Sequence, residues 1–131
     1  MLLTKPPTVD FERFTVVRVS LPFTDRQASK HRPALVLSDA AVFNLPAGHS
    51  VMAMITSADN LAWPLDCQLT DLSAAGLPAP SMVRFKLFTL DHRLVKGKLG
   101  SLSPVDARSV SDARAMLWGQ PAEMGGTLGG M

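Results

Sequence analysis

Three consecutive residues that can carry a positive charge, Lys30, His31 and Arg32, stand directly before a short apolar run. The run, from Ala34 to Leu37, is typical of a strand that is buried on at least one face. Such a strand would hold the arginine and the histidine at its exposed end. The planar fork of an arginine can bind two oxygens of one phosphate, and a histidine titrates near neutral pH. The alternative is that these charges belong to an ordinary solvated loop.

A second pair of polar residues, Thr56 and Ser57, ends the apolar segment 51–57. The connector 39–49 between the two strands shows no helical pattern, which favours antiparallel pairing over a crossover. The end of one antiparallel strand lies beside the start of its partner. We therefore expect these two hydroxyl groups to converge with Arg32 and the preceding histidine at one end of the sheet.

Two aromatic residues and two more cations are further candidates for functional residues. Phe23 lies in the polar loop after the first strand, and Trp63 lies in the loop after Ser57. Each ring either stacks on a nucleobase or packs back against the core. A later strand presents Arg84 and Lys86 on one face, opposite apolar residues.

Positive charge is unevenly distributed along the chain, although the formal net charge is only +2. Lysine and arginine are absent from residues 34–83 and concentrate in two blocks, 26–32 and 84–98. The two blocks either meet in one groove that attracts a polyanion or form separate solvated surfaces.

The elements that must position these residues are mostly strands. Alternating or apolar segments predict strands at 13–21, 34–37, 51–57, 65–70, 82–90 and 96–100. Asp71 and Gly76 bound a single helical turn, and Ser103 followed by Pro104 starts a helix that ends at Gly119. The expected fold is a small, mostly antiparallel, coiled sheet or barrel with a C-terminal helix.

The length of 131 residues suits one compact domain. We expect residues 1–12, which contain two consecutive prolines, to form a loose leader. Residues 13–118 form the domain, and the glycine-rich residues 119–131 are expected to be a flexible tail.

The composition argues against several other classes of protein. Cys67 is the only cysteine, which excludes an internal disulfide and a multi-cysteine zinc site. The histidines show none of the spacings of a local metal cluster, and we expect neither a metal nor a cofactor. Because no segment has the pattern of a signal peptide or a membrane span, we expect a soluble cytoplasmic protein without membrane contact.

Several short motifs follow one another between residue 14 and about residue 118. They are Val16-Val17-Arg18-Val19, Pro22-Phe23-Thr24-Asp25, Lys30-His31-Arg32-Pro33-Ala34-Leu35-Val36-Leu37-Ser38, Met54-Ile55-Thr56-Ser57, Ala75-Gly76-Leu77, Pro80-Ser81-Met82-Val83-Arg84, Phe88-Thr89-Leu90-Asp91 and Lys98-Leu99-Gly100. Each motif alone is weak. In this order they resemble the MazF/PemK family, the toxins of bacterial type II toxin–antitoxin systems.

The resemblance implies an SH3-like barrel that works as a homodimer. It also implies a sequence-specific, metal-independent endoribonuclease that cuts single-stranded RNA, including mRNA, and is held inactive by a cognate antitoxin. In that family the arginine of the Arg-Pro-Ala motif and the threonine that ends the third strand are active-site residues, which correspond here to Arg32 and Thr56. Some members use an arginine at the position of Arg84.

Metal-free RNA cleavage uses the 2′-hydroxyl as the nucleophile and needs a base, an acid and a group that stabilises charge on phosphorus. Arg32 suits the last role, which Arg84 can share. Thr56 can donate a hydrogen bond to a phosphate oxygen, with help from Ser57. His31 is the nearby side chain that titrates near neutrality, and it either acts as acid or base or points into solvent.

The loops 21–29 and 57–64 should determine which bases are accepted, through Phe23 and Trp63. Lys30 and Lys86 complete the residues that we expect to bind RNA.

Two other functions stay open. A gyrase-directed toxin can share this fold, but it needs no hydrolytic site. A catalytically inactive RNA-binding or regulatory module would keep the fold and the groove. This second alternative depends on Lys86, because some family members have an acid at that position, two residues after the second arginine.

Overall fold

The computed structural model describes residues 9–20 and 31–120, and one sheet of six strands forms most of it. The strands are β1 (Thr15–Ser20), β2 (His31–Val36), β3 (His49–Ser57), β4 (Cys67–Gln68), β5 (Ser81–Asp91) and β6 (Val95–Ser101). The helical segments are η2 (Ala40–Asn44), α1 (Leu45–Ala47), α2 (Leu72–Ala75), η3 (His92–Leu94) and α3 (Pro104–Leu117). The predicted fold class, mostly β with a C-terminal helix, is confirmed.

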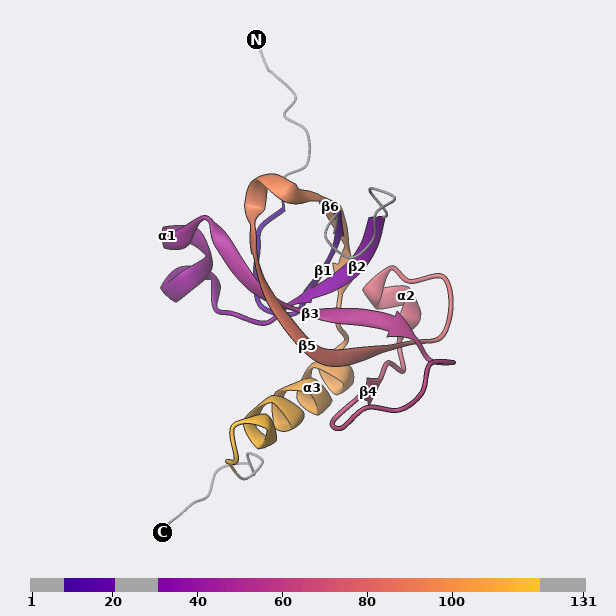
Figure 1. The fold of residues 1–131 in the computed structure, drawn as a ribbon. Helices are drawn as coiled ribbons and strands as arrows, with labels where there is room; N and C mark the ends of the chain where they lie inside the picture. Colours follow the sequence, from indigo (N-terminus) through magenta and orange to yellow (C-terminus); the bar gives the residue numbers. More distant parts are fainter. Residues whose placement is uncertain (1–8, 21–30, 121–131) are drawn as a thin grey trace.

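All strand pairs are antiparallel, and the strand order is β4-β5-β3-β2-β1-β6. The sheet curls into a barrel-like shape, with α3 lying across it (Figure 1). Within the described residues, β4 and β6 remain the edges of the sheet, so hydrogen bonds do not close the barrel.

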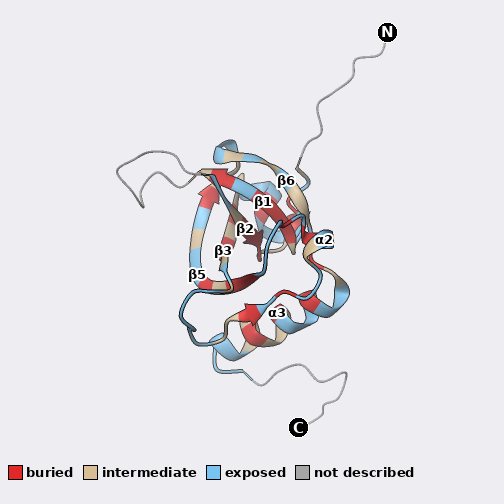
Figure 2. Cartoon of the chain, turned by 90° about the vertical axis from the view of Figure 1, so that its right-hand side faces the viewer, coloured by how far each residue is buried: buried red, intermediate tan, exposed pale blue. Residues whose placement is uncertain are grey.

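Buried side chains form one cluster on each face of the curled sheet. One cluster joins strand residues such as Leu35 and Ile55 to Val110 of α3. The other contains Val17 and Met52 on the opposite face. Buried positions follow the strands and recur along α3, whose remaining positions are intermediate or exposed (Figure 2). Parts of both faces of the sheet are therefore buried.

A buried carboxylate attaches the start of α3 to the sheet. Asp106 accepts hydrogen bonds from the amide and the hydroxyl of Thr70, at 3.0 and 2.8 Å, and from the amide of Asp71 at 3.0 Å. Burial alone would raise the pKa of Asp106, but these hydrogen bonds, with one involving Ser103, lower it overall. Ser103 also caps α3 by accepting from the amide of Asp106, as the sequence predicts.

The short helix α2 contacts β6 at two glycines. Asp71 caps its start, and Gly76 ends it in the left-handed conformation with φ of +72°. A β-carbon on Gly76 would collide with the carbonyl of Leu99, and one on Gly100 would collide with the backbone of Ala74 and Ala75. This backbone contact holds the start of the loop that follows α2 against β6.

The expectation of a connector without a helix between β2 and β3 is wrong. Asp39 accepts a hydrogen bond from the amide of Val42 and starts η2, which continues into α1. The Asn44 amide group is buried and donates to the carbonyls of Phe11 and Ser38. Both helical turns are too short to show a periodic pattern. The antiparallel pairing of β2 with β3 is nevertheless confirmed.

The strand expected at 65–70 is shorter than predicted. Leu65 has φ of +66°, a conformation that a strand does not accommodate. At the other end, the amide of Thr70 is bound by Asp106 instead of a neighbouring strand. Only Cys67 and Gln68 therefore pair with β5.

The described part of the expected leader, residues 9–12, packs on the sheet. Phe11 is buried, and its ring stacks on His92 with a centroid distance of 3.5 Å. The side chain of Asp10 lies 3.7 Å from that of Lys98. Residues 1–8, and the part of the expected tail from residue 121 onward, lie outside the described residues.

Candidate functional site

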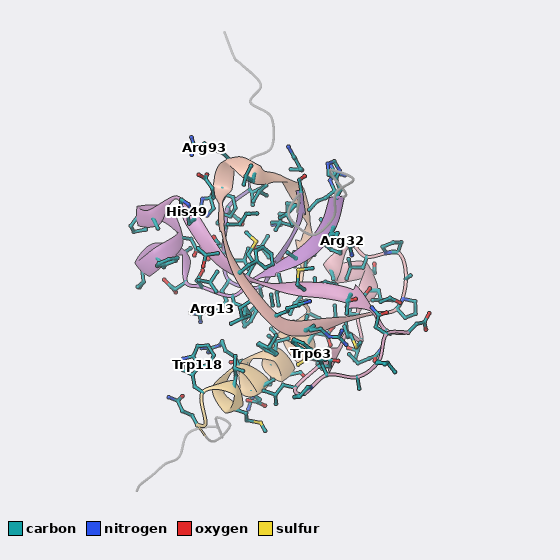
Figure 3. The ribbon with its side chains drawn as sticks, in the orientation of Figure 1. Arg13, Arg32, His49, Trp63, Arg93 and Trp118 are labelled. Atoms are coloured by element: carbon teal, nitrogen blue, oxygen red, sulfur yellow. The ribbon has the colours of Figure 1, made fainter. Side chains whose placement is uncertain are left out.

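The site begins where β2 and β3 run side by side. Ala34 pairs with Met54, and the same antiparallel register continued by two residues brings Arg32 opposite Thr56. Cross-strand partners point to the same face of a sheet, so both side chains lie on one surface. Arg32 lies on the side of the molecule far from His49 and Arg93 (Figure 3).

A pocket of about 450 Å³ opens at this end of the sheet. Its lining includes His31, Arg32, Thr56 and Ser57, so the structure brings these four predicted residues together. The rest of the lining is Pro33, Ile55, Asn60 and residues 77–81. Among the described residues, the lining contains one arginine and no acidic residue. The pocket therefore suits a negatively charged group.

Two loops form the walls of the pocket. The amide of Ala58 donates to the carbonyl of Pro80 at 3.1 Å, which joins the loop after β3 to the loop before β5. The Asn60 side-chain nitrogen donates to the hydroxyl oxygen of Thr56 at 2.5 Å. The hydroxyl of Ser57 accepts from the amide of Asp59 at 3.1 Å. Both hydroxyls at the end of β3 are thus held by the loop that follows.

Arg84 occupies a neighbouring but different environment. Its Nε and one terminal nitrogen donate to the two oxygens of Asp66, at 3.2 and 2.9 Å, and the same terminal nitrogen donates to the carbonyl of Leu61 at 2.6 Å. The side chains of Arg84 and Asp66 are 14% and 10% exposed. The hydrogen bond between them lowers the pKa of Asp66 and raises that of Arg84. Arg84 does not line the pocket.

Two cations of β5 lie over the ring of Trp63. The Arg84 guanidinium is 5.3 Å and the Lys86 ammonium 5.8 Å from the centre of the Trp63 ring. A register shift of β5 against β3 near Met54 accompanies this arrangement, because Met54 pairs with Arg84 while Ala53 pairs with Leu87. Trp63 is 43% exposed, so its ring is available for stacking.

Two predicted binding residues, Phe23 and Lys30, lie outside the described residues. Two other residues of the site, Asn60 and Asp66, are missed by sequence reasoning. Asn60 is the fourth residue after Thr56, a spacing that allows a turn to return to the strand end. Asp66 falls in a segment that the sequence predicts as a strand, so nothing indicates its partner in β5.

Among the described residues there is no group of three or more histidine, cysteine or acidic side chains that could hold a metal ion. Within the same residues, no helix is both long and apolar enough to span a membrane.

Comparisons with known proteins show the family and the fold of the chain. Residues 12–115 match the model of a family described as the PemK-like, MazF-like toxin of type II toxin–antitoxin systems. A comparison with curated proteins found no match.

Several solved structures share the fold. An endoribonuclease from a mycobacterial species, solved with its cognate antitoxin, has 18% identity and a TM-score of 0.67, over 86% of this chain and 98% of that one. A MazE–MazF structure from Deinococcus radiodurans has 22% identity and a TM-score of 0.65, over 83% and 96%. The Mycobacterium tuberculosis toxin MazF-mt6 has 18% identity and a TM-score of 0.61, over 81% and 97%.

Proposed function

The chain belongs to the PemK-like, MazF-like family of type II toxin–antitoxin toxins, and from this premise we propose that it is a metal-independent endoribonuclease that cuts single-stranded RNA at a short sequence. The pocket shared by Arg32 and Thr56 is the observation that supports this proposal most. Its described lining combines a guanidinium with two hydroxyl donors, which suits a phosphodiester.

The proposed reaction needs only groups of the RNA and the protein. The 2′-oxygen attacks the adjacent phosphorus, the bond from phosphorus to the 5′-oxygen breaks, and the products are a 2′,3′-cyclic phosphate and a 5′-hydroxyl. A base removes the 2′ proton and an acid supplies a proton to the leaving oxygen. Arg32 stabilises the charge that develops on the phosphoryl oxygens, and Thr56 donates a hydrogen bond to one of them.

Proton transfer is assigned to His31, which lines the same pocket as Arg32. A neutral imidazole can take the 2′ proton, and an imidazolium can protonate the leaving oxygen. Ser57 assists as a second hydroxyl donor. Arg84 contributes less directly, because Asp66 and the Leu61 carbonyl already bind two of its three nitrogens. Its remaining terminal nitrogen is the group that could contact RNA.

Recognition of the bases is assigned to the loops beside the pocket. Trp63, supported by Arg84 and Lys86, offers a stacking surface whose flanking charges favour the adjoining phosphates. Phe23 and Lys30, which lie outside the described residues, remain candidates for the same role.

We infer two protein partners from the family to which the chain belongs. A cognate antitoxin would hold the toxin inactive, and two copies of this chain would form a homodimer. Similar proteins have been solved as a MazE–MazF complex and as an endoribonuclease with its antitoxin, which supports the first of these partners. With mRNA as its substrate, the toxin would act in the cytoplasm.

The proposal is tested by incubating the protein with a long single-stranded RNA in the presence of EDTA and mapping the new ends. Arg32→Ala should reduce cleavage by about 100-fold or more, the usual effect of removing a group that stabilises transition-state charge. Arg108→Ala is the matched control, because it removes the same charge from an exposed position of α3 that does not line the pocket.

Cleavage at a recurring sequence, lost in Arg32→Ala and retained in Arg108→Ala, would support the proposal. RNA binding without cleavage by the folded wild type would overturn it in favour of an inactive RNA-binding module. For the role of His31, we expect His31→Gln to lower kcat by about 100-fold or more, the usual contribution of a general acid or base. A kcat equal to that of the wild type would remove His31 from the mechanism.

A further inference from the structure

Asn60 is held in place beside Thr56 by the turn that follows β3. The amide of Asn60 donates to the carbonyl of Ser57 at 3.1 Å, and the amide of Ala58 is bound to Pro80 across the pocket wall. The side-chain nitrogen of Asn60 lies 2.5 Å from the hydroxyl oxygen of Thr56, and both residues line the pocket. The backbone of the turn thus places the carboxamide at the end of β3.

The direction of this hydrogen bond determines whether the Thr56 hydroxyl can still donate its proton to another acceptor. A hydroxyl has one proton to donate and two lone pairs that accept, whereas the NH₂ of a carboxamide only donates. When Thr56 accepts from Asn60, the hydroxyl proton stays available for another acceptor. The same holds for Ser57, whose hydroxyl accepts from the amide of Asp59.

We propose that Asn60 is a positioning residue that fixes the Thr56 hydroxyl as a donor toward the phosphate in the pocket. The inference rests on the proposed ribonuclease function and adds a residue to it. Because the carboxamide is neutral, Asn60 orients the hydroxyl without placing a negative charge near the phosphate. The side chain need not touch the RNA, and its effect is transmitted through Thr56.

A double-mutant cycle tests this dependence in a steady-state cleavage assay. Asn60→Ala should lower kcat roughly 10-fold, the effect of losing about one oriented hydrogen bond in the transition state, with little change in KM. In a Thr56→Val background, which lacks the hydroxyl, Asn60→Ala should cause no further loss. Leu61→Ala is the control, because the Leu61 side chain is 89% exposed on the same loop.

Asn60→Asp provides a second, independent readout. An ionised carboxylate accepts the proton of Thr56, which reverses the hydrogen bond and adds a negative charge beside the pocket. We expect a larger loss of activity than for Asn60→Ala at pH 7. Activity relative to the wild type should recover as the pH falls toward 4, close to the ordinary pKa of an aspartic acid, because the protonated carboxyl can donate again.

The outcomes separate this inference from the proposed function. If the wild type cleaves RNA and Asn60→Ala matches it, or if the two losses simply add in the cycle, the positioning role is overturned and the ribonuclease proposal stands. If Asn60→Asp shows no recovery at lower pH, Asn60 does not orient the Thr56 hydroxyl as a donor. If the wild type cleaves no RNA, the proposed function fails first, and the inference fails with it.

Discussion

Asp66 and Arg84 form a largely buried ion pair in which both carboxylate oxygens accept from the guanidinium. Asp66 also accepts from the amide of Trp63 at 2.8 Å, and Arg84 also donates to the carbonyl of Leu61. One carboxylate and one guanidinium therefore tie the loop after β3 to β5, and this loop carries one wall of the pocket.

We predict that Asp66→Asn frees the charge of Arg84 while keeping the shape of the side chain. The melting temperature should fall, because an arginine with low exposure loses its ionic partner. RNA binding should become more sensitive to salt, with the logarithmic slope steeper by about 0.7 for one added phosphate contact to a single strand.

Asp59→Asn is the matched control for this charge change, because Asp59 is exposed in the same loop. Binding isotherms at several salt concentrations and thermal unfolding curves check the prediction. An equal change in slope for both variants would show that net charge, and not the release of Arg84, is responsible.

For Trp63, we predict direct stacking on a base of the RNA. Trp63→Ala should weaken RNA binding by about 5- to 150-fold, which corresponds to about 1–3 kcal/mol for one stacked base, and Trp63→Phe should retain most of the affinity. The chain has two tryptophans, so Trp118→Phe leaves Trp63 as the only indole reporter. Its fluorescence should then change on titration with RNA. If Trp63→Ala instead lowers the melting temperature and leaves the affinity for RNA unchanged, the ring packs against the core and does not stack on a base.

For Asp106, we predict a contribution to stability that acid removes. The pKa of this carboxyl is lower in the folded protein than in the unfolded chain, where it is about 3.9. The contribution is therefore complete above that value and is lost as the pH falls through the folded pKa. Asp106→Ala should cost about 1.5–3 kcal/mol at pH 7, because donors on Thr70 and Asp71 lose a charged acceptor.

Urea unfolding between pH 7 and pH 3 measures this effect. The free energy of unfolding should fall more steeply with acid in the wild type than in Asp106→Asn. Asp59→Asn should follow the wild type. Parallel curves for the wild type and Asp106→Asn would contradict the prediction.

For the contact between α2 and β6, we predict that the backbones leave no space for a methyl group at Gly100. Gly100→Ala should destabilise the protein by about 1–3 kcal/mol, the usual cost of overpacking, because the new β-carbon meets the backbone of Ala74 and Ala75. Gly97→Ala is the control on the same strand, since a β-carbon there meets nothing within 4 Å. Similar unfolding midpoints for both variants would mean that α2 moves away at little cost.

The sequence was sufficient to predict where Arg32 and Thr56 meet, because antiparallel pairing of two apolar strands leaves one arrangement of their ends. The cap of α3 at Ser103 and the left-handed Gly76 were predictable for a similar reason, since both depend on local chemistry.

The features that sequence reasoning missed depend on long-range contacts. Asp66 meets Arg84 only because β4 and β5 are neighbours. Phe11 appeared to belong to a leader, yet its ring stacks on His92, far away in the chain. No pattern of spacing indicates such pairs before the sheet order is known.

The division of the pocket between strands and loops has a consequence for how such proteins diverge. Arg32 and Thr56 are attached to paired strands, whereas Asn60, Trp63 and residues 77–80 lie on loops between elements. Substitutions in these loops leave the strand pairing unaltered. If the proposed function holds, a few substitutions in these loops can therefore change which RNA sequence is recognised, while Arg32 and Thr56 stay in place.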